Sequence, residues 1–254
     1  MNHLARHFTV QELRKRYLGT IGAGLWAIAH PLVQLAIYST VFAVIFQARV
    51  PEMPEAPFAV WLALAFWPWI AFAEAVQRGS VVIGENAALI GKVPIPTSIL
   101  VIATTSASFL VHGIGYLAVL LVLAAMGMPV ALHMLPFAVL LFVGLALLAQ
   151  GLAWLVAAFS VFLRDVAQLV TQLLMLGFFL TPIFYSRTML PEHWRPWLDL
   201  NPMTGYVEGF RALFLGMPAP SPLAIGVSAA ATVISFLAGR MLFHRLSRHF
   251  HDYL

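Results

Sequence analysis

The sequence predicts an all-α integral membrane protein with six transmembrane helices. The chain has 254 residues, of which 61% are hydrophobic and 9% charged, whereas a soluble domain usually carries about a quarter charged residues. It contains several apolar runs of about the 20 residues that a helix needs to cross a bilayer. Backbone groups inside lipid find no water to bond, so an open chain must satisfy them within helices.

Six apolar runs are candidate spans, and no internal repeat or second soluble domain interrupts them. They cover approximately residues 24–46, 58–77, 98–123, 135–162, 166–185 and 222–243. We therefore expect residues 1–254 to form a single transmembrane domain.

The distribution of basic residues predicts the orientation. Six spans leave both termini on one side. If that side is the cytosol, only Arg49, Arg187, Arg195 and Arg211 of the 14 Lys and Arg residues lie outside. The positive-inside rule then predicts that both termini and the loop between the second and third spans are cytosolic. Cytosolic loops also explain the net charge of +4, so we expect no nucleic-acid partner.

The composition and spacing exclude several kinds of chemistry. The chain has no cysteine, which rules out disulfides and thiolate metal sites. The stretch GENAALIGKVPIP contains Gly-Lys, but six residues separate Gly84 from Gly91 and Val93 follows Lys92. A phosphate-binding P-loop needs four residues there and a Ser or Thr after the lysine. No metal cluster or catalytic set is evident, so we expect no cofactor on this chain.

The first 20 residues predict a basic amphipathic helix in the headgroup plane of the membrane. Its apolar side chains recur at roughly helical spacing: Leu4, Phe8, Leu13 and Tyr17. Basic side chains lie beside them: Arg14, Lys15 and Arg16. An ordinary positive-inside anchor is the alternative.

The longest predicted external segment, residues 186–221, contains a second amphipathic stretch. Apolar residues in 200–216 follow the i, i+3, i+4 pattern. This stretch is too charged to span comfortably and too apolar for open water. It predicts a short re-entrant or interfacial helix between the fifth and sixth spans, with a cap helix packed on the bundle as the alternative.

Few ionisable residues lie at membrane depth, and we single out His30, Glu74 and His112. A charged group there is costly and is a functional candidate by default. Glu74 precedes Arg78 by four residues, which predicts a local ion pair. His112 and His30 can stay neutral and bond to a neighbouring helix. A proton relay through these groups is the alternative.

Four stretches together resemble the permease subunit of ABC-2 type exporters. They read RKRYLGTIGAGLWAIAHPLVQLAIYSTVF, GENAALIGKVPIPTSIL, FLRDVAQLVTQLLMLGFFLTPIFY and PEHWRPWLDLNPMTGYVEGFRALFLG, in this order along nearly the whole chain. The branch they resemble most exports polysaccharides, namely O-antigen, capsular polysaccharide and teichoic acid.

The resemblance implies a homodimer bound to two copies of an ABC ATP-binding subunit. ATP and Mg would lie on that partner, so this chain is expected to be a transport subunit and not an enzyme. The complex would move a lipid-linked polysaccharide across the bacterial inner membrane. Membrane lipid and periplasmic export proteins are further implied partners.

The same resemblance assigns roles to three groups of residues. Residues 84–96 resemble the helix that couples to the ATP-binding subunit, with Glu85, Asn86, Leu89, Ile90 and Lys92 as contacts. The N-terminal helix resembles a gate that meets lipid headgroups, with Arg14, Lys15, Arg16 and Tyr17. The first and fifth spans would line the channel, with the aromatic residues Tyr38, Phe42, Phe46, Phe178, Phe179 and Tyr185.

Three other functions remain open from the sequence. An ABC-2 exporter of drugs or lipids would share most of these features. An ion-coupled secondary transporter usually carries ionisable groups or broken helices at mid-membrane, and here only His30 and His112 lie near that depth. A membrane enzyme or an assembly scaffold is the third alternative, and no catalytic set in the sequence supports an enzyme.

Overall fold

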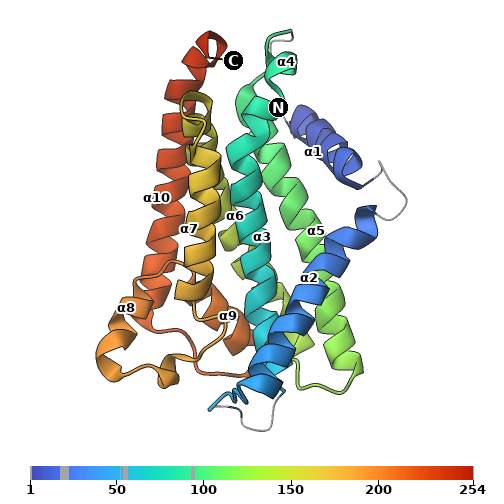
Figure 1. Cartoon of the computed structure of the whole chain (residues 1–254), viewed down its shortest axis with the longest axis vertical. Coiled ribbons are helices and arrows are strands. Elements are labelled where there is room, and N and C mark those ends of the chain that lie inside the picture. Colours follow the sequence, from blue (N-terminus) through green and yellow to red (C-terminus); the bar gives the residue numbers. More distant parts are fainter. Residues whose placement is uncertain (1, 18–22, 52, 54–56, 93–94, 254) are drawn as a thin grey trace.

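The computed structural model describes residues 2–17, 23–51, 53, 57–92 and 95–253. Every regular element within these residues is a helix, as the sequence predicts (Figure 1). The α-helices are α1 Asn2–Tyr17, α2 Ala23–Thr40, α3 Phe58–Glu85, α4 Ala87–Ile90, α5 Thr97–Ala125, α6 Leu135–Phe162, α7 Val166–Leu180, α8 Arg195–Asp199, α9 Thr204–Leu215 and α10 Pro222–Leu246. The short elements are the π-helix η1 Val41–Ile45 and the 3-10 helices η2 Leu132–Met134, η3 Arg187–Met189, η4 Glu192–Trp194 and η5 Ser247–Asp252.

Five helical stretches of the described residues are long and apolar enough to cross a membrane. They are Ile28–Ile45, Phe58–Glu85, Thr97–Ala125, Leu132–Phe162 and Pro222–Phe250. These stretches correspond to five of the six predicted spans.

The other predicted span, at residues 166–185, contains α7, which has only 15 residues. At 1.5 Å per residue it rises about 22 Å, against a hydrocarbon core of about 30 Å. The helix stops because Thr181 precedes Pro182, and a residue before proline disfavours helical backbone. Thr181 is extended, with φ −83° and ψ 141°. A sixth span therefore stays a prediction.

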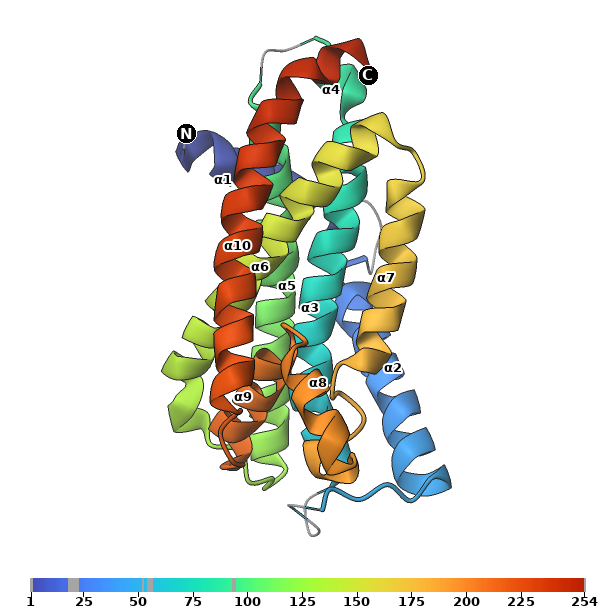
Figure 2. The same cartoon turned by 90° about the vertical axis from the view of Figure 1, so that its left-hand side faces the viewer.

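Helix α3 is the centre of the bundle. It packs against α2, α5, α6, α7 and α9, and both views show it between its neighbours (Figures 1 and 2). Its Trp61, Phe66 and Trp67 are almost completely buried. The Trp67 indole also donates a hydrogen bond to the His112 carbonyl of α5, at 2.9 Å. Because lipid is as apolar as a helix face, such packing and hydrogen bonds hold membrane helices together.

Helices α6 and α10 approach closely at two glycines. A Cβ placed on Gly239 would collide with the backbone of Gly151, and one placed on Gly151 would collide with the backbone at Ser235 and Phe236. Small residues at a crossing let two helix backbones touch, which is common in membrane bundles. These glycines therefore fix how α6 and α10 pack side by side (Figure 2).

The two ends of the bundle carry different elements. Helices α1 and α4 and the end of α10 lie toward one end, which we call the terminal end (Figure 1). Helices α8 and α9 lie at the opposite end. Helix α1, the turn α4 and the end of α10 thus lie on one side of the bundle (Figure 1).

Candidate functional site

A groove of about 370 Å³ opens between α2, α3 and α7. Four aromatic side chains line it: Tyr38, Phe66, Trp69 and Phe178. Three polar side chains line it as well: His30, Gln34 and Glu74. We call it the aromatic groove. Its volume lies within the range of about 300–1,000 Å³ that is usual for binding sites of small molecules.

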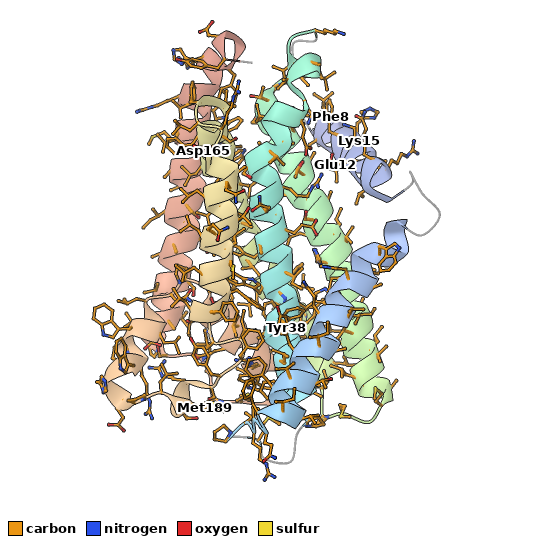
Figure 3. All side chains as sticks on the ribbon, viewed as in Figure 1. Phe8, Glu12, Lys15, Tyr38, Asp165 and Met189 are labelled. Carbon is orange, nitrogen blue, oxygen red and sulfur yellow. The ribbon has the colours of Figure 1, made fainter. Side chains whose placement is uncertain are left out.

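Tyr38 holds the aromatic part of the groove together. Its ring meets Phe66 edge-on at 5.7 Å between centroids and Phe178 at 5.8 Å. It also meets Phe184 edge-on at 5.2 Å. Rings in these orientations attract one another by about 0.5–1.5 kcal/mol beyond their burial. Tyr38 therefore joins the three helices of the groove at one point (Figure 3).

Of the six aromatic residues predicted for the channel, Tyr38 and Phe178 line the groove. Phe42 stacks on Phe184 at 4.7 Å, and Phe179 stacks on the same ring at 6.0 Å. These positions extend the aromatic cluster beyond the groove.

Phe46 and Tyr185 lie at the edge of that cluster. Phe46 is 66% exposed and touches only Phe42 among the described rings. The hydroxyl of Tyr185 donates to the Leu180 carbonyl at 3.0 Å. The structure thus brings the predicted aromatic residues to one region, and only part of them to the groove itself.

The sequence reading missed the contribution of α3. Phe66, Trp69, Ile70, Ala73 and Glu74 all line the groove. Their spacing of i, i+3, i+4, i+7 and i+8 is the stripe of one helix face. The hydrophobicity of the sequence did not reveal this face of α3, because the whole helix is apolar.

Glu74 is held by α5. Its carboxylate accepts a hydrogen bond from the Ser108 hydroxyl and is joined to His112 Nε2, both at 2.8 Å. The prediction that His112 bonds to a neighbouring helix is confirmed. We expected Glu74 to pair with Arg78, whereas Arg78 reaches across to Glu12 of α1, at 3.2 Å.

The predicted coupling loop forms a single helical turn, α4, after a break at Asn86. The Asn86 side chain donates to the Val82 carbonyl at 2.8 Å, and its own carbonyl accepts from the amides of Leu89 and Ile90. Ile90 is 4% exposed and belongs to the protein's own core. Glu85 and Lys92 are exposed. The side chains of Glu85 and Lys92 are therefore accessible, and Ile90 anchors the turn, whereas a coupling role for them stays a prediction.

Helix α1 lies against the same region. Phe8, Glu12 and Lys15 border a small cleft that Asn86 and Leu89 close from the other side (Figure 3). The predicted gate helix and the predicted coupling loop therefore border the same cleft. Arg14 and Lys15 are exposed. Arg16 and Tyr17 belong to α1, but their side chains lie outside the described part of the structure.

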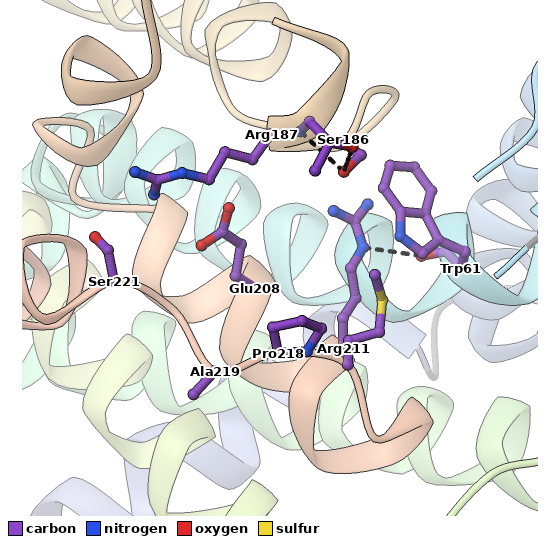
Figure 4. Close-up of a pocket in the computed structure, with 10 residues that line it drawn as sticks. Trp61, Ser186, Arg187, Glu208, Arg211, Pro218, Ala219 and Ser221 are labelled. Carbon is purple, nitrogen blue, oxygen red and sulfur yellow. Dashed lines mark hydrogen bonds between the residues drawn. The ribbon is translucent and has the colours of Figure 1, made fainter. Parts of the chain in front are cut away.

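At the opposite end, Arg211 of α9 is buried among backbone carbonyls. Its guanidinium donates to the carbonyls of Trp61, Pro182 and Ile183, at 3.2, 2.6 and 2.8 Å. It also stacks 3.3 Å above the Trp61 ring (Figure 4). A cation over an indole face is attracted by the ring quadrupole. Arg211 therefore ties α9 to α3 and to the end of α7.

A second polar pair stands beside this cluster. The Arg187 guanidinium forms a bidentate pair with the Asp199 carboxylate, in which Nη2 and Oδ2 are 2.7 Å apart. This hydrogen bond raises the pKa of Arg187 above its ordinary value. Arg187, Glu208 and Arg211 line a pocket of about 240 Å³ at this end of the bundle (Figure 4).

The helix predicted within residues 200–216 is present as α9 and packs against α3, α6 and α10. It begins later than expected, because Asn201 forms a turn in which its side chain accepts from the Met203 amide, at 2.9 Å. It ends at Gly216, which has a left-handed backbone with φ 65°.

Comparison with known proteins identifies the family. Residues 6–215 match the family of ABC-2 type transporters. The chain is 29% identical over 246 residues to an O-antigen export system permease protein RfbA of Myxococcus xanthus, covering 94% of this chain and 91% of the relative. Two O-antigen export system permease proteins RfbA of Klebsiella pneumoniae are 26% and 24% identical, covering 82% and 97% of this chain and 78% and 93% of the relatives.

The family match covers most of the chain and agrees with an all-helical bundle that has several membrane-length helices. The described residues hold no group of three or more potential metal ligands. The protein is a multi-pass membrane permease and belongs to the ABC-2 type transporter family.

Proposed function

We propose that this chain is the membrane half of an ATP-driven exporter that moves a lipid-linked polysaccharide of the O-antigen or capsule type. The three relatives, all O-antigen export permeases, support this class of substrate. ATP and Mg bind a separate ABC ATP-binding subunit, of which two copies join two copies of this chain. Residues 1–254 act as a single transmembrane domain in the bacterial inner membrane.

The aromatic groove is the observation that carries the proposal. Tyr38 and Phe178, which are half-buried, line it together with the buried rings of Phe66 and Trp69. A sugar ring has apolar C–H faces and polar edges, so it fits a surface of aromatic faces with polar groups beside them. A row of such rings lets a polymer slide, because no single contact holds it tightly.

A second copy of the chain closes this groove into a channel. On both sides of the groove, α2 and α7 expose apolar side chains, among them Val33, Ile37, Leu173 and Leu176, which are 53–56% exposed. Large apolar faces beside a binding groove mark an interaction site. In a two-fold dimer the same faces meet, and the two grooves face one another.

The terminal end is the cytosolic side, where the ATP-binding subunit docks. Exposed Glu85 and Lys92 flank α4 and meet that subunit, and a push on α4 acts directly on α3. The pair between Glu12 and Arg78 carries the movement to α1. Helix α1 lies in the headgroup plane, where Arg14 and Lys15 attract the phosphates of the lipid carrier.

The membrane topology has six spans and cytosolic termini. Helix α7 is the fifth span, completed by residues 181–185, and the bilayer adapts to its short length at modest cost. Helix α9 enters the outer leaflet without crossing it. Periplasmic export proteins receive the polymer at this end.

Deletion of the gene in the native host is the first test, with the tagged full chain restored from a plasmid. We expect surface polysaccharide to disappear on deletion, and an ATP-binding subunit to co-purify with the tagged chain in mild detergent. If the deletion leaves surface polysaccharide unchanged and alters drug sensitivity, the substrate is instead a drug or a lipid. A chain that crosslinking joins to no ATP-binding subunit would contradict the ABC mechanism.

A further inference from the structure

A second groove opens between α6, α9 and α10, and we call it the α9 groove. Its volume is about 530 Å³. Helix α9 has 12 residues, so it lies beside only one end of the long helix α10 (Figure 2). Gly205, Gly209 and Ala212 of α9 line the groove at the spacing of one helix face. Among the described residues, the α9 groove and the aromatic groove have no lining residue in common.

The other walls of the α9 groove belong to two helices that are long and apolar enough to cross a membrane. Phe137 and Leu140 of α6 and Ile225 of α10 line it and are 59%, 69% and 51% exposed. All three lie within the first six residues of their helices, which rise about 9 Å. Half of a bilayer's hydrocarbon core is about 15 Å thick. The groove therefore opens outward near the ends of two spans, at the depth of a single leaflet.

The chemistry of the lining favours an apolar occupant. Only two polar side chains, Tyr206 and Ser228, are among the described residues that line the groove, and both are buried. The Tyr206 hydroxyl is joined to the Thr232 hydroxyl at 2.7 Å, and the Ser228 hydroxyl donates to the Pro202 carbonyl at 2.7 Å. Both hydroxyls thus bond within the protein. A polar ligand such as a sugar would lose its bonds to water here and gain few in return, whereas a hydrocarbon chain loses none.

One end of the α9 groove adjoins the charged pocket at the end of the bundle. Ala219, in the segment between α9 and α10, lines both the groove and that pocket. The pocket carries Arg187, Glu208 and Arg211 (Figure 4). An apolar groove that continues into a charged pocket at the end of the spans matches an amphipathic molecule. Its chain would lie along the helices, and its polar head would lie beside charged side chains instead of inside hydrocarbon.

We propose that the α9 groove binds one acyl chain of a membrane phospholipid, whose headgroup lies at the charged pocket. The chain fills the space beside the short helix and holds α9 against α6 and α10. Bulk lipid is as apolar as the groove, so the preference comes from close packing and not from the hydrophobic effect. The inference does not depend on which substrate the transporter moves.

The test uses the full chain, purified in mild detergent and placed in phosphatidylcholine nanodiscs. A small fraction of the lipid is phosphatidylethanolamine with a photo-reactive diazirine in the middle of one acyl chain. After irradiation, mass spectrometry locates the lipid on peptides of the digested protein. We expect residues 135–141 and 204–215 to carry about fivefold more label than residues 230–241 of α10, as a preference of about 1 kcal/mol gives. Equal labelling of these segments would overturn the inference without any variant.

The deciding variant is Ala229→Trp, because Ala229 lines the groove and an indole would fill it. Ala230→Trp is the matched control, since Ala230 is the next residue of α10, is also exposed and does not line the groove. The label on residues 204–215 should be lost in Ala229→Trp and kept in Ala230→Trp. Wild-type labelling in Ala229→Trp, or an equal loss in both variants, would contradict the proposed site.

Thermal unfolding in detergent gives a second readout. Added phospholipid should raise the unfolding temperature of the wild type and of Ala230→Trp by about 2–4 °C, and should leave Ala229→Trp unchanged. An equal rise in all three proteins would contradict a specific site.

Two other occupants are distinguished by the same labelling experiment. Crosslinks that join the α9 segments of two chains would assign the groove to a second copy and overturn the inference. Displacement of the label by polyprenyl phosphate, and not by unlabelled phosphatidylethanolamine, would assign it to a polyprenyl carrier and overturn it as well. Each of these results leaves the deletion test of the proposed function as it stands.

Discussion

At the scale of single residues, the cost of burying a charge explains the geometry around Arg211. Its side chain is 3% exposed, and a buried cation is tolerated only with partners that replace water. The carbonyls of Trp61, Pro182 and Ile183 serve as those partners. Two of these carbonyls belong to the chain just after α7, where the helix has ended and cannot satisfy them. Arg211 therefore satisfies carbonyls of the non-helical segment that follows α7, as well as its own donors.

We predict that Arg211→Met destabilises the protein by about 3 kcal/mol, because three buried carbonyls lose their donor. Arg211→Lys should recover only part of this loss, since an ammonium cannot reach all three in one plane. The measurement is thermal unfolding of the purified protein in detergent. Arg195→Lys, at a site that is 33% exposed, is the control and should change little. Unfolding of Arg211→Met at the wild-type temperature would refute this role.

At the scale of elements, close contact between helices depends on the absence of side chains at a few positions. Gly239 of α10 packs on the backbone of Gly151 of α6. Gly226 of the same helix has no neighbouring atom within 4 Å of a Cβ placed on it. In α10, therefore, close packing requires a glycine at position 239 and does not require one at position 226.

Gly239→Leu should separate α6 from α10 and lower the unfolding temperature, because the new side chain would fall on backbone atoms that cannot move aside. Gly226→Leu should leave stability unchanged or raise it by up to about 1 kcal/mol, since glycine is a poor helix former. Fluorescence-detected size-exclusion chromatography of heated samples measures both. Equal behaviour of the two variants would show that the α6–α10 contact tolerates a larger spacing.

Helix α1 is a separate case at this scale. It is joined to the bundle through its packing on α5 and the pair between Glu12 and Arg78. That pair is partly exposed, and such pairs contribute about 0–1 kcal/mol. Helix α1 thus packs on the outside of the bundle and borders the cleft beside the coupling turn, a position that suits the proposed role as a gate.

At the scale of the whole molecule, the distribution of exposed apolar residues indicates which face would meet a second copy in the proposed dimer. The window Ile28–Ile45 of α2 and η1 is only 6% buried, whereas that of α3 is 78% buried. Helix α2 therefore contributes one lightly packed wall of the groove. Lipid would cover this face in a monomer, and a partner covers it in a dimer.

The absence of cysteine permits a direct test of the dimer. We predict that a single cysteine at Ile37 of α2 forms a disulfide-linked dimer in native membranes under mild oxidation, since residues near a two-fold axis meet their own copies. A cysteine at Val233 of α10 has similar exposure, 57% against 55%, and should stay monomeric. Crosslinking at Val233 and not at Ile37 would assign the dimer to the other face.

The sequence by itself determined the class of the protein, five of its six predicted spans and its family resemblance. Low charge and long apolar runs leave a helical membrane bundle as the only way to satisfy the backbone, and the order of the four motifs indicated an ABC-2 permease. The same resemblance assigned the aromatic residues of the spans at residues 24–46 and 166–185 to one channel.

Only the tertiary structure decided which of these residues share a site. In a helix that is apolar on every side, periodicity does not show which face lines a groove and which face packs against other helices. For this reason Phe66 and Glu74 were not assigned to the groove from the sequence. Ser108 and His112 of α5, which bond the Glu74 carboxylate, lie 34 and 38 residues away in the sequence. No local spacing predicts such contacts. Packing between helices, which depends on residues distant in sequence, made the groove and its fixed carboxylate.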